Sequence, residues 1–234
     1  MTFEEIINVI NVKPYYQDDA VVIYNADCRE ILPRIPDKSI DLVLTDPPYG
    51  LNLKMQGGTW GIKFKHSDMK DWDYLVDQDL INSIVAKAEI SIIWGGNNYQ
   101  LPPTRGWLAW DKLQKLDTLA DFELAWTNLD IPCHSWTEKR NHAKNGNQHP
   151  TQKPVSLFQW CILKVPEAYL LLDPFLGSGT TAYCAKKLGR KCIGIEIEEK
   201  YCEIAAKRCS QSVMPLEASL EPPPSQFPLL STPQ

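Results

Sequence analysis

The stretch YLLLDPFLGSGTTAYCAKKLG, residues 169–189, decides the fold class. A continuous apolar run ends in Asp173, a turn follows, and Gly177-Ser178-Gly179-Thr180-Thr181-Ala182 opens a helix. This is a G-x-G-x-x-A pattern between a strand and a helix, the context that a nucleotide-type loop requires. The glycines let the backbone approach a ligand, and the small final residue permits close packing of helix on sheet. The stretch therefore predicts a strand–loop–helix unit of a parallel α/β sheet.

The acids around this loop indicate which ligand it takes. The next strand, KCIGIEIEE, carries Glu196 at its end, seventeen residues beyond Gly179, where a carboxylate can accept hydrogen bonds from ribose hydroxyls. A phosphate-binding P-loop needs a lysine after its last glycine, and none follows Gly179. Asp173 would also repel a pyrophosphate. The pattern favours a cationic ligand, such as S-adenosyl-L-methionine with its sulfonium and amino groups.

TDPPYG, residues 45–50, marks a second strand end. It follows the apolar run IDLVL, and two consecutive prolines cannot continue a central strand because neither has an N–H for the ladder. Asp46 and Tyr49 are therefore expected on a stiff loop at the carboxyl end of that strand, where open α/β sheets bind ligands. Taken alone, the segment is equally compatible with an ordinary turn, since Asp and Pro are common turn residues.

Strands alternate with helices along most of the chain, which predicts a mostly parallel sheet with helices on both faces. Apolar runs and turn residues predict seven strands, over residues 20–26, 40–45, 90–96, 105–112, 122–128, 168–173 and 191–197. Helices are expected near residues 3–10, 28–35, 76–88, 153–165, 179–188 and 198–209. The tryptophan-rich segments 105–112 and 122–128 would form a reversed hairpin at one edge. We expect one Rossmann-like domain over residues 1–210 and a flexible, proline-rich tail over 211–234.

Composition argues against several classes of protein. The 234 residues are 44% hydrophobic and 23% charged, as in soluble globular proteins. No apolar run reaches membrane-spanning length, and the start of the chain, MTFEEIINVI, lacks the features of a signal peptide. The seven cysteines include no C-x-x-C pair and the four histidines lack metal-ligand spacing, so the sequence indicates neither disulfides nor a metal site. We expect a reduced, cytoplasmic protein.

Taken together, DPPYG upstream and DPFLGSGTT downstream resemble the catalytic and cofactor motifs of amino-group DNA methyltransferases. Their order resembles the permuted beta arrangement of that family. HPTQKP at 149–154 and GIEI at 194–197 match two further family motifs. YNADCREIL at 24–32 resembles a third, with Ala26 in place of the usual glycine. The resemblance extends over residues 15–210 and implies the seven-stranded methyltransferase sheet.

The resemblance also implies the residues of a methyltransferase site. The catalytic residues would be Asp46, Pro47, Pro48 and Tyr49. The residues that bind S-adenosyl-L-methionine would be Asp27, Thr151, Gln152, Lys153, Asp173, Phe175, Gly177, Ser178, Gly179, Thr180 and Glu196. Among these, Lys153 would lie near the methionine moiety. No metal is expected to take part.

The chemistry explains why an acid precedes two prolines. The exocyclic amine of adenine or cytosine is a poor nucleophile because its lone pair is delocalised into the ring. Acceptors for both amino protons, the Asp46 carboxylate and the Pro47 carbonyl, would pull the nitrogen towards tetrahedral geometry and release that lone pair. Tyr49 would stack on the base, which must flip out of the duplex to reach such a pocket.

The predicted function is methyl transfer from S-adenosyl-L-methionine to adenine N6 in DNA. Adenine is favoured by the resemblance, because cytosine N4 enzymes of this arrangement often carry serine in place of Asp46. Cytosine N4 is the alternative, followed by a catalytically silent DNA- or cofactor-binding module and by methylation of RNA or protein glutamine. No nuclease motif is evident in the sequence. A solitary bacterial, prophage or phage enzyme therefore fits, and a restriction partner encoded elsewhere stays open.

The expected partner is double-stranded DNA, which a short recognition segment of the chain would bind. Residues 129–148 lie where the beta arrangement usually carries its target-recognition insert. The cations of this region are Lys139, Arg140 and Lys144, which we expect to contact DNA phosphates. The alternative is that these residues form a solvated basic loop. The sequence leaves the oligomeric state open between a monomer and a homodimer.

Overall fold

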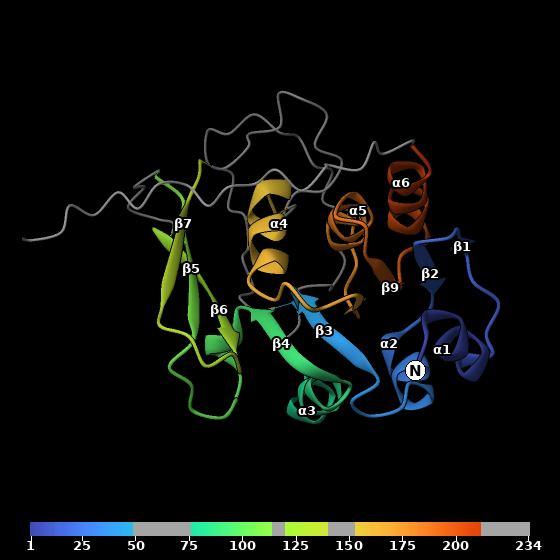
Figure 1. Ribbon diagram of the computed structural model, residues 1–234, viewed down its shortest axis with the longest axis horizontal. Coiled ribbons are helices and arrows are strands. Elements are labelled where there is room, and N and C mark those ends of the chain that lie inside the picture. The colour runs from blue at the N-terminus through green and yellow to red at the C-terminus, as the bar shows by residue number, and fades with distance from the viewer. Residues whose placement is uncertain (49–75, 114–119, 140–152, 212–234) are drawn as a thin grey trace, which may run out of the picture.

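The computed structural model describes residues 1–48, 76–113, 120–139 and 153–211. Their strands form one sheet in the order β1-β2-β9-β8-β3-β4-β6-β5-β7 (Figure 1). The strands are β1 (Tyr16–Gln17), β2 (Val21–Asn25), β3 (Ile40–Thr45), β4 (Ala88–Trp94), β5 (Trp107–Asp111), β6 (Phe122–Thr127), β7 (His134–Thr137), β8 (Leu170–Asp173) and β9 (Lys191–Glu196).

Helices cover both faces of this sheet. They are α1 (Phe3–Ile10), α2 (Cys28–Ile31), α3 (Gln78–Ala86), α4 (Val155–Leu163), α5 (Thr180–Lys187) and α6 (Glu199–Ser210), with short 3-10 turns at Leu32–Arg34 and Gly96–Asn98. Figure 1 shows α4, α5 and α6 on one side of the sheet and α1, α2 and α3 on the other. Successive strand residues point to opposite faces, so Ile23 packs in the core under α4–α6 while its neighbour Tyr24 packs in the core beside α1–α3.

The five central strands, β2, β9, β8, β3 and β4, run parallel to one another. Every residue of β8 is buried, as are four of the five residues of β2. Parallel strands covered on both faces are continuously apolar rather than alternating, which is why LLLD and VVIYN are recognisable as strands in the sequence. The strand β6 reverses direction and pairs antiparallel with both β4 and β5.

The predicted fold class is confirmed: a mostly parallel α/β sheet with helices on both faces and a reversed hairpin. The sheet has nine strands within the described residues rather than the expected seven. One addition is β1, which has only two residues, and the other is β7, a polar strand of sequence HSWT outside β5. Both are short edge strands with little apolar content, so hydrophobic periodicity does not detect them. As a result, the β5–β6 hairpin is not at the edge.

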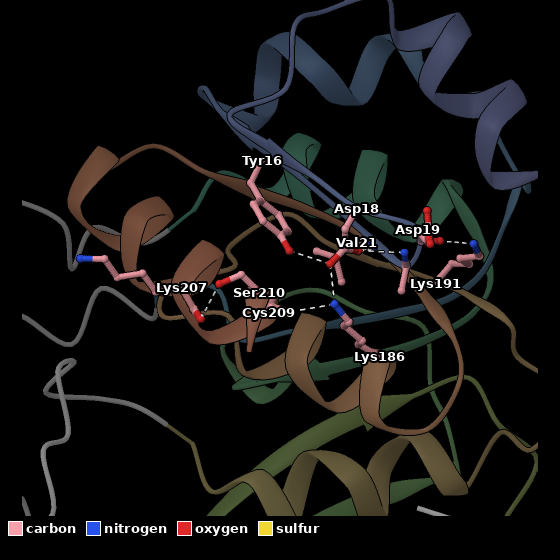
Figure 2. A network of polar contacts seen from close by, with 10 residues as sticks. Tyr16, Asp18, Asp19, Val21, Lys186, Lys191, Lys207, Cys209 and Ser210 are labelled. Atoms are coloured by element: carbon pink, nitrogen blue, oxygen red, sulfur yellow. Dashed lines mark hydrogen bonds and ion pairs between the residues drawn. The ribbon is translucent and has the colours of Figure 1, made fainter. Parts of the chain in front are cut away.

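A polar cluster fastens the β1 edge to the helices (Figure 2). Asp18 Oδ2 accepts hydrogen bonds from the Tyr16 hydroxyl at 2.6 Å and from Lys186 Nζ at 2.5 Å. Lys186 Nζ also donates to the carbonyl oxygen of Cys209, at the end of α6, at 2.7 Å. A single half-buried lysine on α5 therefore connects the N-terminal edge with the last helix.

Several predictions fall on residues outside the described ranges: Tyr49, Arg140, Lys144, Thr151, Gln152 and the proline-rich tail from residue 212. Within the predicted recognition segment, residues 129–139 are described, and 134–137 form β7. The proposed division into a domain and a tail stays a prediction. In the described part of the chain, no helix is both long enough and apolar enough to cross a membrane.

Candidate active site

The carboxyl ends of β3, β8 and β9 meet at one edge of the sheet and carry the predicted acids. Asp46 follows β3 directly, Asp173 is the last residue of β8, and Glu196 is the last residue of β9. From β3 the chain passes to β4 on one side, and from β8 it passes to β9 on the other. The strand order therefore reverses between β3 and β8, the position at which open α/β sheets bind their ligands.

Asp173 is buried at the centre of this edge, with 3% of its surface exposed. Its Oδ1 accepts hydrogen bonds from the Thr45 hydroxyl at 2.7 Å and from the Phe175 amide at 3.1 Å, and Oδ2 accepts from the Thr181 hydroxyl at 2.5 Å. Burial raises the pKa of Asp173 to about 6, although these hydrogen bonds oppose the shift. Asp173 thus ties the start of α5 to the end of β3.

Two contacts hold the TDPPYG segment, one at its acid and one at its second proline. Asp46 Oδ2 lies 2.5 Å from Lys153 Nζ, which forms an ion pair with it. The Tyr99 hydroxyl donates to the carbonyl oxygen of Pro48 at 2.6 Å. The fixed φ of each proline limits the backbone further. Residues 46–48 are therefore positioned by Tyr99, which follows β4, and by Lys153, which precedes α4.

The glycine loop has the backbone conformation that its sequence predicts. Gly177 and Gly179 have φ angles of 52° and 80°, in the left-handed region that favours glycine. A Cβ atom on Gly179 would lie 2.7 Å from the Cβ of Ala205 on α6, so the loop also needs glycine for close packing. These two glycines let the loop turn directly from β8 into α5.

Glu196 holds the loop from the neighbouring strand. Its Oε2 accepts from the Gly177 amide at 2.8 Å and its Oε1 accepts from the Glu198 amide at 2.8 Å. Burial raises the pKa of Glu196, while the two amide hydrogen bonds act in the opposite direction. A carboxylate oxygen has two acceptor sites, so each oxygen can accept another hydrogen bond, for example from a ribose hydroxyl.

The other predicted residues of the loop also lie at this edge. Ser178 and Thr180 are buried, and Arg208 Nη1 donates to the Thr180 hydroxyl at 3.1 Å. Phe175 is half-buried and packs against the core beside α1–α3. Asp27 follows the end of β2 and caps α2, accepting from the Arg29 amide at 2.9 Å.

These residues fit a cationic nucleoside better than a phosphate. Asp173 and Glu196 both contact the glycine loop, and Asp27 follows β2, the strand next to β9. Each of the three carboxylates already accepts backbone or hydroxyl hydrogen bonds that fix its direction. Hydroxyl groups of a ribose and the positive groups of S-adenosyl-L-methionine suit such acceptors. Among the described residues, no cluster of three potential metal ligands exists.

Three site residues were missed by the sequence analysis: Tyr99, Glu123 and Lys112. Glu123 on β6 pairs with Lys153 at 3.1 Å and with Lys112 at 2.6 Å. The signal in the sequence is a charge inside an apolar strand, since Glu123 stands between Phe122 and Leu124. Its partners could not be read from spacing, because strand register and the approach of residue 153 bring them together.

Comparisons with known proteins agree with this geometry. A family profile described as DNA methylase, covering the N6 and N4 methyltransferases, matches residues 74–207, more than half of the chain. The chain belongs to this DNA methylase family. The matched region contains the glycine loop, Lys153 and Glu196, and it begins after Asp46. The predictions of a DNA methyltransferase and of S-adenosyl-L-methionine as its methyl donor are thereby confirmed.

Relatives of this methylase extend over most of its length. The Type II methyltransferase M2.DpnII of Streptococcus pneumoniae is 26% identical over 261 residues, which cover 86% of this chain and 93% of the relative. The Type II methyltransferase M.ScaI of Streptomyces caespitosus is also 26% identical, covering 84% of this chain and 83% of the relative.

Solved structures show the same fold at lower identity. The PvuII DNA methyltransferase, described as cytosine-N4-specific, aligns with a TM-score of 0.57 at 18% identity, covering 85% of this chain and 89% of the other. The M1.HpyAVI–SAM complex aligns with a TM-score of 0.52 at 23% identity, covering 80% of this chain and 99% of the other. The methylase therefore has the Rossmann-like methyltransferase fold that its sequence predicts.

Proposed function

We propose that this methylase transfers a methyl group from S-adenosyl-L-methionine to N6 of adenine in double-stranded DNA, with Asp46 and the adjoining prolines as its catalytic residues. The observation that carries the proposal is the position of Asp46. Its carboxylate stands directly after β3, beside the strand that leads into the glycine loop. A base bound against Asp46 and a methyl donor bound over the glycine loop would therefore meet between β3 and β8.

In this proposal the bound cofactor supplies an electrophilic methyl group on a sulfonium. The Asp46 carboxylate and the Pro47 carbonyl accept hydrogen bonds from the target amine and make its lone pair available. That lone pair forms the new N–C bond, the electron pair of the broken C–S bond stays with sulfur, and one amine proton leaves to solvent. The hydrogen bond from Tyr99 to the Pro48 carbonyl supports this role by fixing the loop before substrate arrives.

The target base must reach Asp46 from inside a duplex, so base flipping is part of the proposal. Adenine rests on the resemblance of DPPY to adenine enzymes. The names of the relatives, Type II methyltransferases, support a place in restriction-modification. Such an enzyme would act in the cytoplasm of a bacterium.

The test is a pair of variants at the two ends of β3. We expect Asp46→Ala to lower kcat by ~100-fold or more, the size of loss seen when one preorganised hydrogen-bonding group is removed, with cofactor affinity near that of the wild type. Asp41→Ala is the matched control, because Asp41 accepts from the Tyr169 and Leu170 amides at 2.9 and 2.8 Å at the far end of the same strand. It should reduce stability and leave kcat unchanged.

Nucleoside mass spectrometry on the treated DNA identifies the product. N6-methyladenine in wild-type reactions supports the proposal, whereas N4-methylcytosine alone would replace adenine by the alternative base. Near wild-type turnover by the Asp46→Ala variant would remove Asp46 from the catalytic residues.

A further inference from the structure

Four side chains of alternating charge, two buried and two half-buried, form a row that ends at the catalytic loop. Lys112 Nζ lies 2.6 Å from Glu123 Oε1, Lys153 Nζ lies 3.1 Å from Glu123 Oε2, and Lys153 Nζ lies 2.5 Å from Asp46 Oδ2. We propose that Glu123 is a positioning residue for methyl transfer, which holds the Lys153 ammonium against Asp46, and that Lys112 balances the charge of Glu123. This inference rests on the methyl transfer proposed above.

The two ammonium groups of the row are taken out of water. The side chain of Lys112 is 2% exposed and that of Lys153 is 7% exposed. A buried charge is costly unless it is paired, so each lysine depends on its carboxylates. Aromatic rings complete the surroundings, with Lys112 Nζ 5.5 Å from the ring centroid of Trp110 and Lys153 Nζ 5.9 Å from that of Trp94. The ammonium of Lys153 is therefore fixed in place rather than mobile at the surface.

Glu123 is the centre of the row because its two oxygens contact different lysines. Burial alone would raise the pKa of Glu123, but the charges of Lys153 and Lys112 outweigh it and lower the pKa to about 2. The same reasoning applies to Lys153, since burial lowers its pKa and the nearby Asp46 and Glu123 carboxylates more than reverse that effect. Glu123 and Lys153 therefore both remain charged through the neutral range.

Strand register places Glu123 within reach of both lysines. In the β5–β6 hairpin Glu123 is opposite Trp110, two residues before Lys112. The backbone amide of Lys112 donates to the carbonyl oxygen of Asp121 at 3.1 Å, so the hairpin continues past the end of β5. Lys153 stands two residues before α4 and approaches from another part of the chain. The reversed hairpin thus places the Glu123 carboxylate against Lys153, which in turn contacts Asp46.

Charge balance beside Asp46 matters because the target amine gains positive charge as it is methylated. Within the row itself, the formal charges of Lys112, Glu123, Lys153 and Asp46 sum to zero. Without the charge of Glu123 the other three sum to +1, which opposes the development of positive charge on the amine. The Lys153 ammonium would also lose its ion pair with Glu123 and keep the one with Asp46. Both effects slow the chemical step rather than substrate binding.

A purely structural role makes a different prediction. If the row only stabilises the hairpin, removing Glu123 lowers the stability and leaves the rate of methyl transfer per folded molecule unchanged. The comparison therefore needs kcat, KM and unfolding measured on the same full-length variants, with unmodified bacteriophage genomic DNA as substrate because it offers every short recognition sequence.

Four variants test the proposal. We expect Glu123→Gln to lower the single-turnover rate by ~10-fold or more while KM for cofactor and for DNA stays near the wild-type value. Glu123→Asp keeps the charge and should recover most of the rate. The double variant Glu123→Gln/Lys112→Met restores the neutral sum and should be faster than Glu123→Gln alone. Asp18→Asn is the control, because it removes the charge that pairs with Lys186 at 2.5 Å (Figure 2). This pair lies at the β1 edge of the sheet, with β2, β9 and β8 between β1 and β3, so the variant should change stability only.

A wild-type single-turnover rate for Glu123→Gln would overturn the proposal. So would a loss of rate in Glu123→Gln that the Asp18→Asn control reproduces at equal loss of stability. Failure of the proposed function is a separate result, because it would appear as absent methylation by the wild-type protein or full methylation by the Asp46→Ala variant.

Discussion

The Thr45 hydroxyl donates to Asp173 Oδ1 across 2.7 Å and joins the end of β3 to the end of β8. The two residues are 128 positions apart in the chain. One belongs to the TDPPYG segment and the other opens the glycine loop, so a single buried hydrogen bond connects the two segments that we propose to bind the target base and the cofactor. Asp173 therefore holds β3, β8 and the start of α5 together, in addition to its proposed role in cofactor binding.

The buried charge of Asp173 predicts a pH-dependent stability. The pKa of Asp173 is about 6 in the folded protein, above its ordinary value of 3.8. Between these two pH values the folded state therefore holds a proton on Asp173 that the unfolded state has lost. The stabilising contribution of this group is therefore full below about pH 4 and is lost as the pH rises through 6. Asp173→Asn cannot titrate and should be more stable than the wild type at pH 8, by at most roughly 3 kcal/mol at 1.36 kcal/mol per pKa unit.

Urea unfolding between pH 4.5 and 8 measures this difference. An asparagine at 173 can still accept from Thr45 and Phe175 and can donate to the Thr181 hydroxyl, so the hydrogen bonds are replaceable. Asp130→Asn is the control, since the Asp130 side chain is 85% exposed. A difference between Asp173→Asn and wild type that does not change with pH would contradict the raised pKa.

Alanine substitutions at Gly179 and Gly189 distinguish the cost of backbone strain from the cost of a steric clash. Both have positive φ, 80° and 69°, so alanine is strained at either position. A Cβ atom at 179 would lie 2.7 Å from the Cβ of Ala205, whereas at 189 no heavy atom lies within 4 Å. We expect Gly189→Ala to cost about 1 kcal/mol of stability and Gly179→Ala to cost more, with weaker cofactor binding.

Thermal unfolding and calorimetric titration with S-adenosyl-L-methionine check this pair. Ala205→Gly removes the atom that a Cβ at 179 would meet, so it should recover part of the loss in the Gly179→Ala background. Equal losses of stability at 179 and 189 would show that packing against α6 does not constrain the loop.

Much of the fold could be predicted from the sequence because buried parallel strands are continuous apolar runs. The segments LLLD and KCIGIE are such runs, and each is followed by a clear change to helical periodicity. The edge strands could not be predicted in the same way. His134–Thr137 alternates half-buried and exposed residues, and its pairing with β5 depends on a neighbour that the sequence does not specify.

The site, like the fold, contains residues that the sequence predicts and residues that it does not. Asp46, Asp173 and Glu196 are predictable because each follows an apolar strand, and the carboxyl ends of parallel strands lie at one edge of the sheet. Tyr99 and Glu123 act through contacts made across elements distant in sequence, with Pro48 and Lys153 respectively. Their roles depend on three-dimensional register, which spacing along the chain does not contain.

Glu196 should contribute to cofactor binding in two ways, by accepting hydrogen bonds from the ribose hydroxyls and by holding the glycine loop through the Gly177 amide. Glu196→Gln replaces one acceptor oxygen by a donor, so either the Gly177 or the Glu198 amide loses its partner. We expect cofactor affinity to fall ~10-fold, as for the loss of a hydrogen bond to a charged group. Glu198→Gln is the control, because Glu198 is exposed two residues further on. Unchanged affinity in the Glu196→Gln variant would mean that the cofactor binds elsewhere.

DNA affinity is expected to depend on Lys139, Arg140 and Lys144. Lys139 is exposed two residues beyond β7, and the other two follow it in the sequence. A short recognition segment can place few side chains on base edges, each good contact discriminating by about 1–3 kcal/mol, so phosphate contacts should supply much of the binding. Replacing all three by alanine should weaken binding across all sequences and flatten the slope of log affinity against log salt by roughly 0.9 per lost contact.

The control for this triple variant must also remove three positive charges, but from another part of the surface. Lys13, Lys187 and Lys207 lie on or after α1, α5 and α6, away from β7, so their triple alanine variant tests net charge alone. Fluorescence anisotropy with duplex DNA, measured between 50 and 200 mM salt, gives both slopes. If the Lys139, Arg140 and Lys144 variant changes affinity no more than this control, the basic segment is only solvated and the DNA phosphates are held elsewhere. A flatter slope in that variant alone assigns the phosphate contacts to the segment after β7.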